Sequence, residues 1–370
     1  MKPLSILLLG TQMATGGAQK LLLDQARWFD AHGHKVTIAF IYDRDNLFHL
    51  WKESISIPIH NLKAFDRNSN FIKQSLLFIS GVRKLWALLR REKFDAVITY
   101  THDSNTIGLP LAWLTGVHVR IGTHLGVIRD IPKWREKLHA ILVNIGCIQT
   151  LIAASSGTRQ NAIKEGVSPS RIQVIPNGVE AFEVHPEDRE KVRQKLNVKP
   201  HELLLVTVGR LVYEKGHEFL IKAMVDVIKE FPNAKAVICG IGPLHDELLI
   251  LIKGNSLENH VQLIGLWDDI PQLLSAADMF VLPSRWEGLS IALLEGMMAK
   301  LPILATKVEG VEEAVQDSVN GLLVAPGDVQ ALGKGIIQLL SNPQMRKQMG
   351  LAASQQVLQG TPLMECVNNT

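Results

Sequence analysis

Short, continuous apolar runs alternate with longer stretches of helical periodicity along nearly the whole chain. Residues 4–9 form one such run, which ends at Gly10, and an amphipathic stretch over residues 19–31 follows. Short apolar runs without polar alternation are typical of strands buried on both faces of a parallel sheet. The pattern predicts strands at residues 4–9, 36–41, 96–99, 117–121 and 151–154, and again at 203–208, 236–239, 261–263, 279–282 and 303–305.

A strand followed by a glycine turn occurs twice, at Gly10 and at Gly209, which predicts two separate sheets. Between the two halves, residues 181–202 are charged, hold two prolines and lack an apolar run. Buried strands that alternate with helices indicate βαβ units. We therefore expect an α/β protein with two doubly wound, Rossmann-like domains that face each other across a cleft. The expected bounds are 1–180 and 203–350 for the domains, 181–202 for a linker and 351–370 for a tail.

Composition and charge narrow the class of protein. The chain has 370 residues, 46% hydrophobic residues and a formal net charge of +3, which excludes a disordered chain. The three cysteines lie far apart and form no disulfide framework or metal motif, so a reducing, cytoplasmic location is expected. The first apolar run is too short for a signal peptide or a membrane span. Residues 1–180 carry a formal charge of +9 and residues 181–370 carry −6. This difference indicates either a first half that meets acidic molecules or surfaces, or unselected variation between domains.

Two motifs of the first half follow predicted strands. Gly16 and Gly17 separate a buried strand from a helix, where the backbone can approach a ligand and the helix N-terminus favours an anion. The spacing is not that of a dinucleotide-binding fingerprint, and a plain turn remains an alternative. His124, in GTHLG, stands at the end of the strand predicted at 117–121 and can reach into the cleft. A structural histidine is the alternative there.

The stretch VGRLVYEKG places Arg210 and Lys215 just after a predicted strand. Two cations beside glycines at a strand end suit a phosphate group, and a solvated loop is the alternative. Gly240 and Gly242, in ICGIGP, predict a second turn that lets backbone approach closely. Asn177, in VIPNGV, begins an Asn-Gly turn signal before the predicted linker.

The segment VLPSRWEGLSIALLEGM contains two carboxylates, Glu287 and Glu295, eight positions apart. On one helix this spacing corresponds to a rise of about 12 Å with both side chains on one face, which suits an extended ligand held at two points. Glu295 stands among apolar residues, so we expect a buried carboxylate with a partner. Backbone amides of Gly288, Leu289 and Ser290 would face a pyrophosphate at the helix start.

Together, the six ordered motifs TGGAQK, GTHLG, VIPNGV, VGRLVYEKG, ICGIGP and SRWEGLSIALLEG resemble those of the retaining glycosyltransferases of family 4, which have the GT-B fold. The resemblance extends over nearly the whole chain. It implies an enzyme that transfers a hexose from a nucleotide-diphosphate sugar, with retention of anomeric configuration and without a metal or another cofactor. UDP-sugars are the favoured donors, and the acceptor would be a glycan or a lipid-linked glycan in polysaccharide or glycolipid synthesis.

The resemblance also implies roles for individual residues. Arg210 and Lys215 would neutralise the departing diphosphate, and Glu295 would bind the ribose hydroxyls. Glu287 would contact the donor sugar from one domain, and His124 would do so from the other. The remaining substrate contacts would come from Gly16, Gly17, Gly240, Gly242, Gly288, Leu289, Ser290 and Ile291.

The sequence departs from the family pattern at three places. Gln19 stands where many relatives have an acidic residue, so the acceptor preference is not carried over. Lys300 replaces a usual glycine, and residues 363–370 are shorter than the usual final helix that crosses back to the first domain. We therefore expect the tail at 351–370 to make that crossing only in a truncated form.

Two basic amphipathic segments raise the question of a membrane. Residues 71–94 are apolar on one side and contain a single acidic residue, Glu92. Residues 131–142 combine Trp134 with neighbouring lysine and arginine side chains. Such helices can lie on anionic lipid, which would place the protein peripherally at the inner face of a membrane. The alternative for residues 71–94 is a packed domain helix.

Other functions remain open at this point. A sugar-nucleotide epimerase or a sugar-phosphate synthase of the same fold would use the same cations. A catalytically idle nucleotide-sugar-binding subunit is a third alternative. A nicotinamide dehydrogenase is disfavoured by the missing fingerprint, and no nucleic-acid partner is expected.

Overall fold

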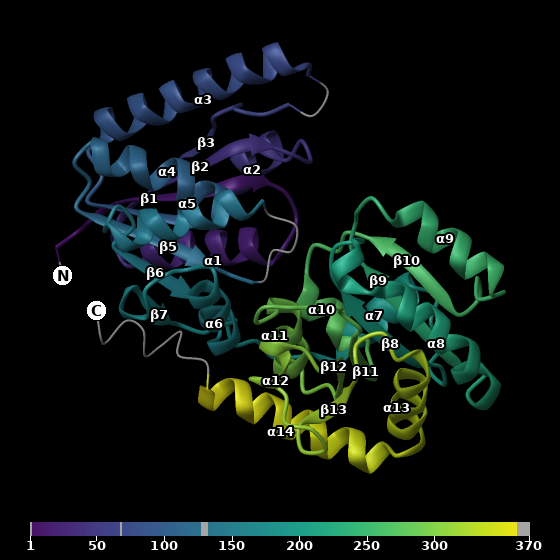
Figure 1. Cartoon of the computed structure of the whole chain (residues 1–370). Helices are drawn as coiled ribbons and strands as arrows, with labels where there is room; N and C mark the ends of the chain where they lie inside the picture. Colours follow the sequence, from purple (N-terminus) through teal and green to yellow (C-terminus); the bar gives the residue numbers. More distant parts are fainter. Residues whose placement is uncertain (1, 67–68, 127–131, 361–370) are drawn as a thin grey trace. The chain divides into compact units, whose positions relative to one another are not determined.

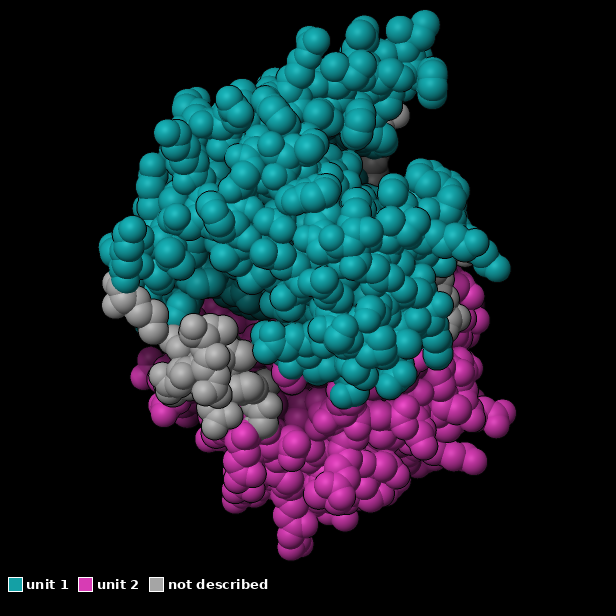
Figure 2. Space-filling model, turned by 60° about the vertical axis from the view of Figure 1, so that its left-hand side comes forward, with its two compact units in different colours: residues 1–175 teal, residues 176–370 magenta. Residues whose placement is uncertain are grey.

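The computed structural model describes residues 2–66, 69–126 and 132–360, and these divide into two compact units (Figures 1 and 2). Unit 1 is Met1–Ile175 and unit 2 is Pro176–Thr370. Each unit is built on its own parallel sheet, as the sequence pattern predicts. Together the sheets and their helices form a two-domain α/β fold of the GT-B type.

The sheet of unit 1 has seven strands in the order β3-β2-β1-β4-β5-β6-β7, and all neighbouring pairs are parallel. The strand order reverses beside β1, which has β2 on one side and β4 on the other, so ligands are expected at the carboxyl ends of these strands. The strands are β1 (Ser5–Met13), β2 (Lys35–Asp43), β3 (Ile59–Asn61), β4 (Ala96–Tyr100), β5 (Val119–His124), β6 (Thr150–Ala153) and β7 (Ile172–Val174).

Two hydrophobic clusters cover the faces of this sheet. Helices α3, α4 and α5 pack on one face, and α1 and α2 pack on the other. The helices of unit 1 are α1 (Gly17–Ala31), α2 (Phe48–Ser54), α3 (Phe71–Glu92), α4 (His102–Leu114), α5 (Lys133–Asn144), α6 (Ser156–Lys164) and the 3₁₀ turn η1 (Pro169–Arg171).

The sheet of unit 2 has six parallel strands in the order β10-β9-β8-β11-β12-β13, with its own reversal between β8 and β11. Its strands are β8 (Leu203–Val208), β9 (Ala234–Cys239), β10 (Val261–Gly265), β11 (Met279–Leu282), β12 (Ile303–Thr306) and β13 (Gly321–Val324). Its helices are α7 (Pro186–Lys195), η2 (Tyr213–Lys215), α8 (His217–Glu230), α9 (His245–Gly254), α10 (Ile270–Ser275), α11 (Ile291–Met298), α12 (Glu309–Glu312), α13 (Val329–Ser341) and α14 (Pro343–Gly360).

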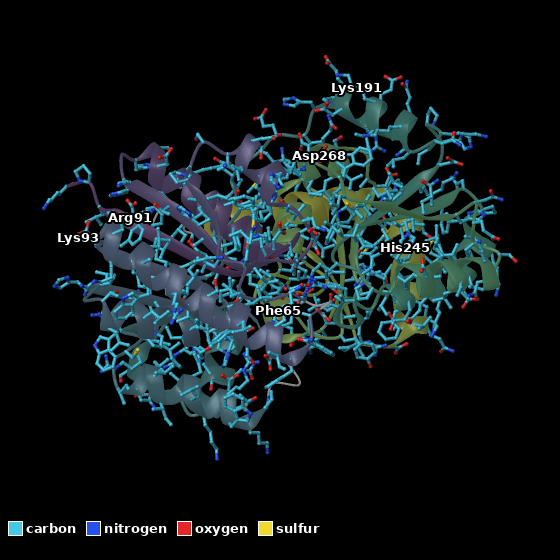
Figure 3. All side chains as sticks on the ribbon, turned by 90° about the horizontal axis from the view of Figure 1, so that it is seen from above. Phe65, Arg91, Lys93, Lys191, His245 and Asp268 are labelled. Atoms are coloured by element: carbon cyan, nitrogen blue, oxygen red, sulfur yellow. The ribbon has the colours of Figure 1, made fainter. Side chains whose placement is uncertain are left out.

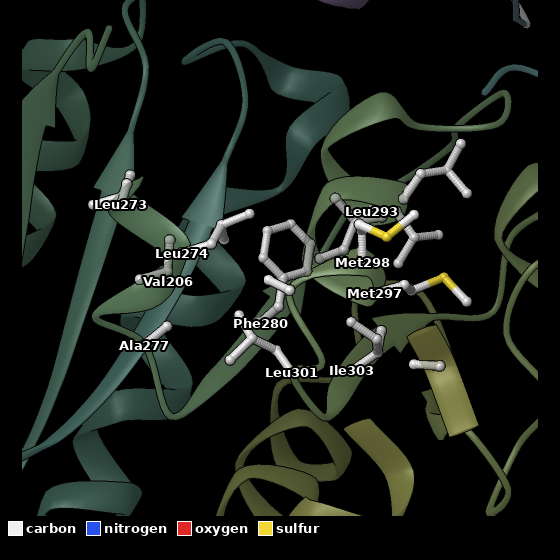
Figure 4. Packing of buried hydrophobic residues seen from close by; sticks show 14 of the residues in the cluster. Val206, Leu273, Leu274, Ala277, Phe280, Leu293, Met297, Met298, Leu301 and Ile303 are labelled. Carbon is white, nitrogen blue, oxygen red and sulfur yellow. The ribbon is translucent and has the colours of Figure 1, made fainter. Parts of the chain in front are cut away.

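The core of unit 2 fixes the position of α11 on the sheet. The fully buried Phe280 of β11 lies between Leu274 on one side and Leu293 and Met298 of α11 on the other (Figure 4). A Cβ atom at Gly296 would lie 2.7 Å from the Phe280 ring, so α11 approaches β11 as closely as only glycine permits. This contact holds the neighbouring Glu295 against the sheet.

The segment predicted as a linker, residues 181–202, differs from that expectation. It contains α7, and Val192, Leu196 and Val198 pack into the core of unit 2. Arg189 and Arg193 both form ion pairs with Asp278, which precedes β11. The high charge of the segment therefore marks the exposed face of a packed helix, while Val192 and the following Leu196 and Val198 are buried in the core.

The predicted tail begins inside α14. Ala353 and Val357 of this helix are buried in unit 2, so residues 351–360 belong to that unit. The predicted crossing by residues 361–370 lies outside the described residues. Within the described ranges, no helix combines the length and the apolar character that crossing a membrane requires.

Candidate active site

The loop after β8 brings both predicted cations to the carboxyl end of the unit 2 sheet. Arg210 follows Gly209 directly, and Lys215 ends the short η2 turn. Gly216 then adopts φ 60°, and a Cβ atom there would lie 2.2 Å from the Pro283 carbonyl oxygen. Only glycine can therefore let this loop pack against the loop after β11.

Lys215 and Glu287, predicted from separate motifs, meet in the structure. The Lys215 Nζ atom lies 2.5 Å from Glu287 Oε1, and the Ser284 hydroxyl donates to the same oxygen at 2.8 Å. Both side chains are largely buried, with exposed fractions of 17% for Lys215 and 9% for Glu287. Charge-assisted hydrogen bonds of this kind stabilise a buried carboxylate. The pair joins the β8 and β11 loops at the point where the strand order reverses.

Arg210 is paired as well. Its Nη2 atom donates to Glu214 Oε1 at 2.8 Å, and both side chains are partly exposed. In this structure each of the two predicted phosphate-binding cations is therefore matched by one carboxylate. An ammonium has three N–H donors and a guanidinium has five, so these pairs leave each cation able to contact an anion as well.

The turn before α11 is held by two contacts. Ser290 is the N-cap of α11, and its hydroxyl accepts a hydrogen bond from the Leu293 amide at 3.4 Å. The Asn177 side-chain amide donates to the Leu289 carbonyl oxygen at 2.7 Å. A Cβ atom at Gly310 would lie 2.0 Å from the Gly288 carbonyl oxygen. These contacts fix residues 288–291 at the helix N-terminus, where an anion is favoured.

The structure corrects the geometry predicted for the two glutamates. Helix α11 begins at Ile291, so Glu287 lies in the preceding loop and only Glu295 is helical. The helical rise of about 12 Å between them therefore does not apply. Glu295 is buried, as predicted, with an exposed fraction of 4%. Its negative charge adds to burial, the main cause, in raising the pKa of the Cys239 thiol at the end of β9 to about 12.

Gly240 and Gly242 allow close backbone approach, as predicted, and the structure shows which backbone they approach. A Cβ atom at Gly240 would lie 1.9 Å from the Gly209 carbonyl oxygen, and one at Gly242 would lie 2.3 Å from the Leu211 carbonyl oxygen. Both glycines thus let the loop after β9 pack against the loop after β8. The backbone that they approach closely is the protein's own.

In unit 1, Gly16 lies between β1 and α1, and Gly17 is the first residue of α1. Gly16 is the N-cap of α1 and offers no side-chain cap to the first amides of the helix. The neighbouring Gln19 side chain donates to the Gln12 carbonyl oxygen at 3.0 Å, which ties the helix start to the end of β1.

His124 is the last residue of β5 and is buried, with an exposed fraction of 6%. Its Nε2 atom lies 3.3 Å from both carboxylate oxygens of Glu165, which follows α6. An ionised carboxylate can only accept, so Nε2 is the donor in this contact. Glu165 was not predicted, because 41 residues separate it from His124 in a segment without a motif.

Two further buried histidines, His102 and His139, lie close to His124 in unit 1. The ring centroids of His102 and His139 are 4.6 Å apart, and those of His124 and His139 are 6.4 Å apart. Burial lowers the pKa of His102 to about 4, with Arg135 adding to the effect. Burial also lowers the pKa of His139 to about 3. The position of His102 three residues after the strand predicted at 96–99 is the one sequence signal that points to this cluster.

In the part of the chain that the structure describes, no three or more His, Cys, Asp or Glu side chains are arranged to hold a metal ion. The charged groups gather instead as cation–carboxylate pairs in unit 2.

Comparison with known proteins agrees with this architecture. Residues 188–356 match the family model described as glycosyl transferases group 1, and residues 15–181 match that of glycosyltransferase family 4. The chain is 30% identical over 288 residues to the UDP-Gal:alpha-D-GlcNAc-diphosphoundecaprenol alpha-1,3-galactosyltransferase of Escherichia coli, with 74% of this chain and 72% of that protein covered. It is 26% identical over 282 residues to the N-acetyl-alpha-D-glucosaminyl L-malate synthase of Bacillus anthracis, with 74% and 72% covered.

Among solved structures, HepE of Anabaena in complex with UDP-glucose superposes with a TM-score of 0.82 at 24% identity, with 96% of this chain and 95% of that chain covered. This likeness supports the fold. Taken with the matches over both halves of the sequence, it confirms the resemblance that the motifs indicate. The chain belongs to glycosyltransferase family 4, the group 1 glycosyl transferases, and is a glycosyltransferase of the GT-B fold.

Proposed function

We propose that this protein is a retaining, metal-independent hexosyltransferase that uses a UDP-sugar and glycosylates a glycan or lipid-linked glycan. The observation that carries the proposal is the contact between Lys215 and Glu287 at the strand-order reversal of unit 2. It joins the predicted phosphate-binding loop to the predicted sugar-binding loop. A donor whose diphosphate meets Lys215 would therefore have its sugar close to Glu287.

Charge stabilisation of the leaving group follows from the two cations. Transfer breaks the bond between the anomeric carbon and the diphosphate oxygen, and negative charge develops on that oxygen. Lys215 and Arg210, with the N-terminus of α11, can supply positive charge at that position. An ammonium has three N–H donors and a guanidinium has five, so each cation could donate to the diphosphate while it keeps its contact with Glu287 or Glu214.

Retention requires that the acceptor oxygen bonds to the anomeric carbon on the face that the diphosphate leaves. In the proposed reaction the acceptor hydroxyl forms this bond and its proton passes to the leaving phosphate. Glu287, with one oxygen held by Ser284 and Lys215, would hold the donor sugar through its hydroxyls. Glu295 would bind the ribose from the buried face of α11, and His124 would contact the sugar from unit 1.

The relatives support the donor and acceptor classes. The Escherichia coli relative is named for UDP-Gal and a diphosphoundecaprenol-linked acceptor, and the HepE structure was determined with UDP-glucose. The Bacillus anthracis relative is named for malate, so acceptors differ among family members. We favour a lipid-linked saccharide for this chain and a peripheral location at the inner face of an anionic membrane.

Product analysis tests the proposal. The full chain is incubated in EDTA with UDP-glucose or UDP-galactose and a short-chain diphosphate-linked saccharide, and the new glycoside is examined by NMR. We expect an α-glycoside, because these donors are α-configured. A β-glycoside would contradict retention, and transfer that requires an added divalent ion would contradict metal independence.

The same assay separates the rival functions. Conversion of the donor sugar without an acceptor would indicate an epimerase, and a sugar phosphate as the preferred acceptor would indicate a synthase. UDP binding without turnover on any acceptor would indicate an idle subunit. Lys215→Ala serves as the inactive reference, and Lys222→Ala, an exposed lysine of α8, serves as the matched control.

A further inference from the structure

The two halves of helix α3 have different environments. In the C-terminal half, Leu85, Leu88 and Leu89 are buried, and Gly81 lies so close to Ala64 that a Cβ atom would be 2.3 Å from the Ala64 Cβ. In the N-terminal half the apolar side chains face solvent: Phe71, Ile72 and Leu76 have exposed fractions of 86%, 72% and 63%. Only half of the segment 71–94 is therefore a packed domain helix. Core packing does not explain the apolar residues of the other half.

Helix α5 presents a second apolar stripe to solvent. Trp134, Leu138 and Ile141 of α5, and Ile145 just after it, are spaced four, three and four residues apart, which places them on one helix face. The opposite face of α5 packs on the sheet through Ala140 and Val143.

The two stripes belong to one side of unit 1. Helix α4 packs against both α3 and α5, and the three helices cover the same face of the sheet (Figure 1). At the end of α4, Trp113 and Leu114 are exposed as well. We call the exposed apolar residues of α3, α4, α5 and Ile145 the outer apolar surface; its members are Phe71, Ile72, Leu76, Phe78, Ile79, Trp86, Trp113, Leu114, Trp134, Leu138, Ile141 and Ile145.

Basic side chains surround this surface. Exposed cations occur along α3 and at the start of α5, and Figure 3 shows Arg91 and Lys93 at the C-terminal end of α3, opposite the end near Phe65. The acidic side chains nearby are largely paired: Glu92 contacts Lys35 and Arg91, and Asp103 contacts Arg135. The exposed cations of α3 and α5 are Lys73, Arg83, Lys84, Arg90, Arg91, Lys133 and Lys137.

We propose that the outer apolar surface binds an anionic lipid bilayer directly. The apolar side chains of the first half of α3 and of the α5 stripe enter the boundary between headgroups and acyl chains, and the surrounding lysine and arginine side chains contact lipid phosphates. This combination is typical of interfacial helices. This inference rests on the proposed function in one respect: a lipid-linked acceptor would be found in the bilayer that the surface binds.

Charge complementarity favours lipid over a second copy of the chain. Large exposed apolar patches mark interaction sites, but a two-fold dimer through this face would bring its cations against each other. An anionic bilayer neutralises them instead. A surface that extends over three helices also suits a flat partner of large area.

Vesicle flotation tests the proposal. The full chain is mixed at low and at high salt with phosphatidylcholine vesicles that contain or lack phosphatidylglycerol. We expect flotation with the anionic vesicles at low salt and at least a severalfold smaller bound fraction at high salt. Failure to float with anionic vesicles at low salt would overturn the proposal.

Variants separate lipid insertion from general charge attraction. The triple variant Ile72→Ser, Leu76→Ser, Ile141→Ser should reduce the bound fraction at least tenfold, and Lys133→Gln with Lys137→Gln should reduce it severalfold. Ile250→Ser with Leu351→Ser, which changes exposed apolar residues of unit 2, is the matched control and should float like the wild type. Flotation of the triple variant equal to that of the wild type would overturn the assignment of the surface.

Two readouts keep this inference distinct from the proposed function. All variants should retain the thermal shift produced by UDP and turnover on a short-chain, water-soluble acceptor, because they lie outside the unit 2 loops. If the wild type lacks both, the proposed function fails while flotation still reports on lipid binding. Light scattering of the protein without vesicles measures its oligomeric state. A dimer that is lost in the triple variant would overturn the proposal, because it would show that the surface binds a second copy of the chain.

Discussion

Units 1 and 2 have the same kind of doubly wound parallel sheet but differ in where their chemical groups lie. Unit 2 places cation–carboxylate pairs, Lys215–Glu287 and Arg210–Glu214, at the reversal of its strand order. Unit 1 has buried imidazoles at the corresponding edge and exposes apolar side chains on its outer helices. Under the two proposals above, a shared architecture would support two kinds of recognition, one by charged loops at the strand ends of unit 2 and one by the helix faces of unit 1.

The largest expected difference between the units is in how much stability each loses at acidic pH. The folded-state pKa values of His102 and His139, about 4 and about 3, lie below the unfolded value of about 6.5. Below about pH 6.5 these histidines take up protons in the unfolded chain but not in the folded unit. The free energy of unfolding that they contribute is therefore fully present above about pH 6.5 and is lost as the pH falls toward 4. For His102 alone the loss is about 3 kcal/mol. Among the described residues of unit 2, His217 is the one comparable group, with a pKa of about 4.

Hydrogen exchange at pH 7.5 and pH 5, measured separately on peptides of each unit, checks this expectation. Protection should fall more in unit 1 than in unit 2. The variant His102→Asn should reduce the difference, and His201→Asn, an exposed histidine of unit 2, should not. An equal loss of protection in both units would contradict the assigned role of the buried imidazoles.

A substitution at Gly240 should destabilise unit 2 selectively. Gly240→Ala would place a Cβ atom 1.9 Å from the Gly209 carbonyl oxygen at a φ of 149°, so the loops after β8 and β9 must separate. We expect a loss of about 3 kcal/mol in the stability of unit 2, from overpacking and backbone strain together. Denaturant unfolding measures it, and Gly254→Ala, where nothing lies within 4 Å, is the control.

Removal of the central cation should affect turnover without affecting the fold to the same degree. Lys215→Ala should lower kcat on the order of 10²-fold, comparable to the loss of an oxyanion donor. Steady-state kinetics at saturating donor measure the change, with Lys222→Ala as the control. An unchanged kcat would remove Lys215 from the reaction.

Loss of the contact between His124 and Glu165 should cause the smallest change in turnover among these predictions. Glu165→Gln removes the negative charge that holds the His124 ring, at a cost of about 1 kcal/mol, and kcat should fall about fivefold with little change in donor KM. In a His124→Ala background the same substitution should have no further effect. Additive losses in the double variant would show that Glu165 acts independently of His124.

The sequence predicts the sheets well because buried parallel strands are continuous apolar runs. The strands that it does not predict, β3, β7 and β13, are short edge strands with few buried side chains. For the segment 181–202 the sequence predicts a linker because charge dominates its composition, whereas α7 buries Val192 against the core of unit 2.

For the site, motifs predict which residues gather but not the contacts between them. Lys215 and Glu287 are predicted separately, and their pairing follows from the adjacency of β8 and β11 in the sheet. Gly240 and Gly242 are predicted to be special, but only the structure shows that they make room for the β8 loop. Glu165, His102 and His139 reach His124 through tertiary packing, which local spacing does not encode.

Titration calorimetry with UDP in EDTA tests most directly that unit 2 binds a nucleotide diphosphate through Lys215 without a metal. The wild type and Lys222→Ala should bind UDP with the same affinity, and Lys215→Ala should bind it at least tenfold more weakly, since a charged hydrogen bond to the diphosphate is lost. UDP binding that is equal in all three proteins, or that appears only when a divalent ion is added, would contradict the proposed role of Lys215.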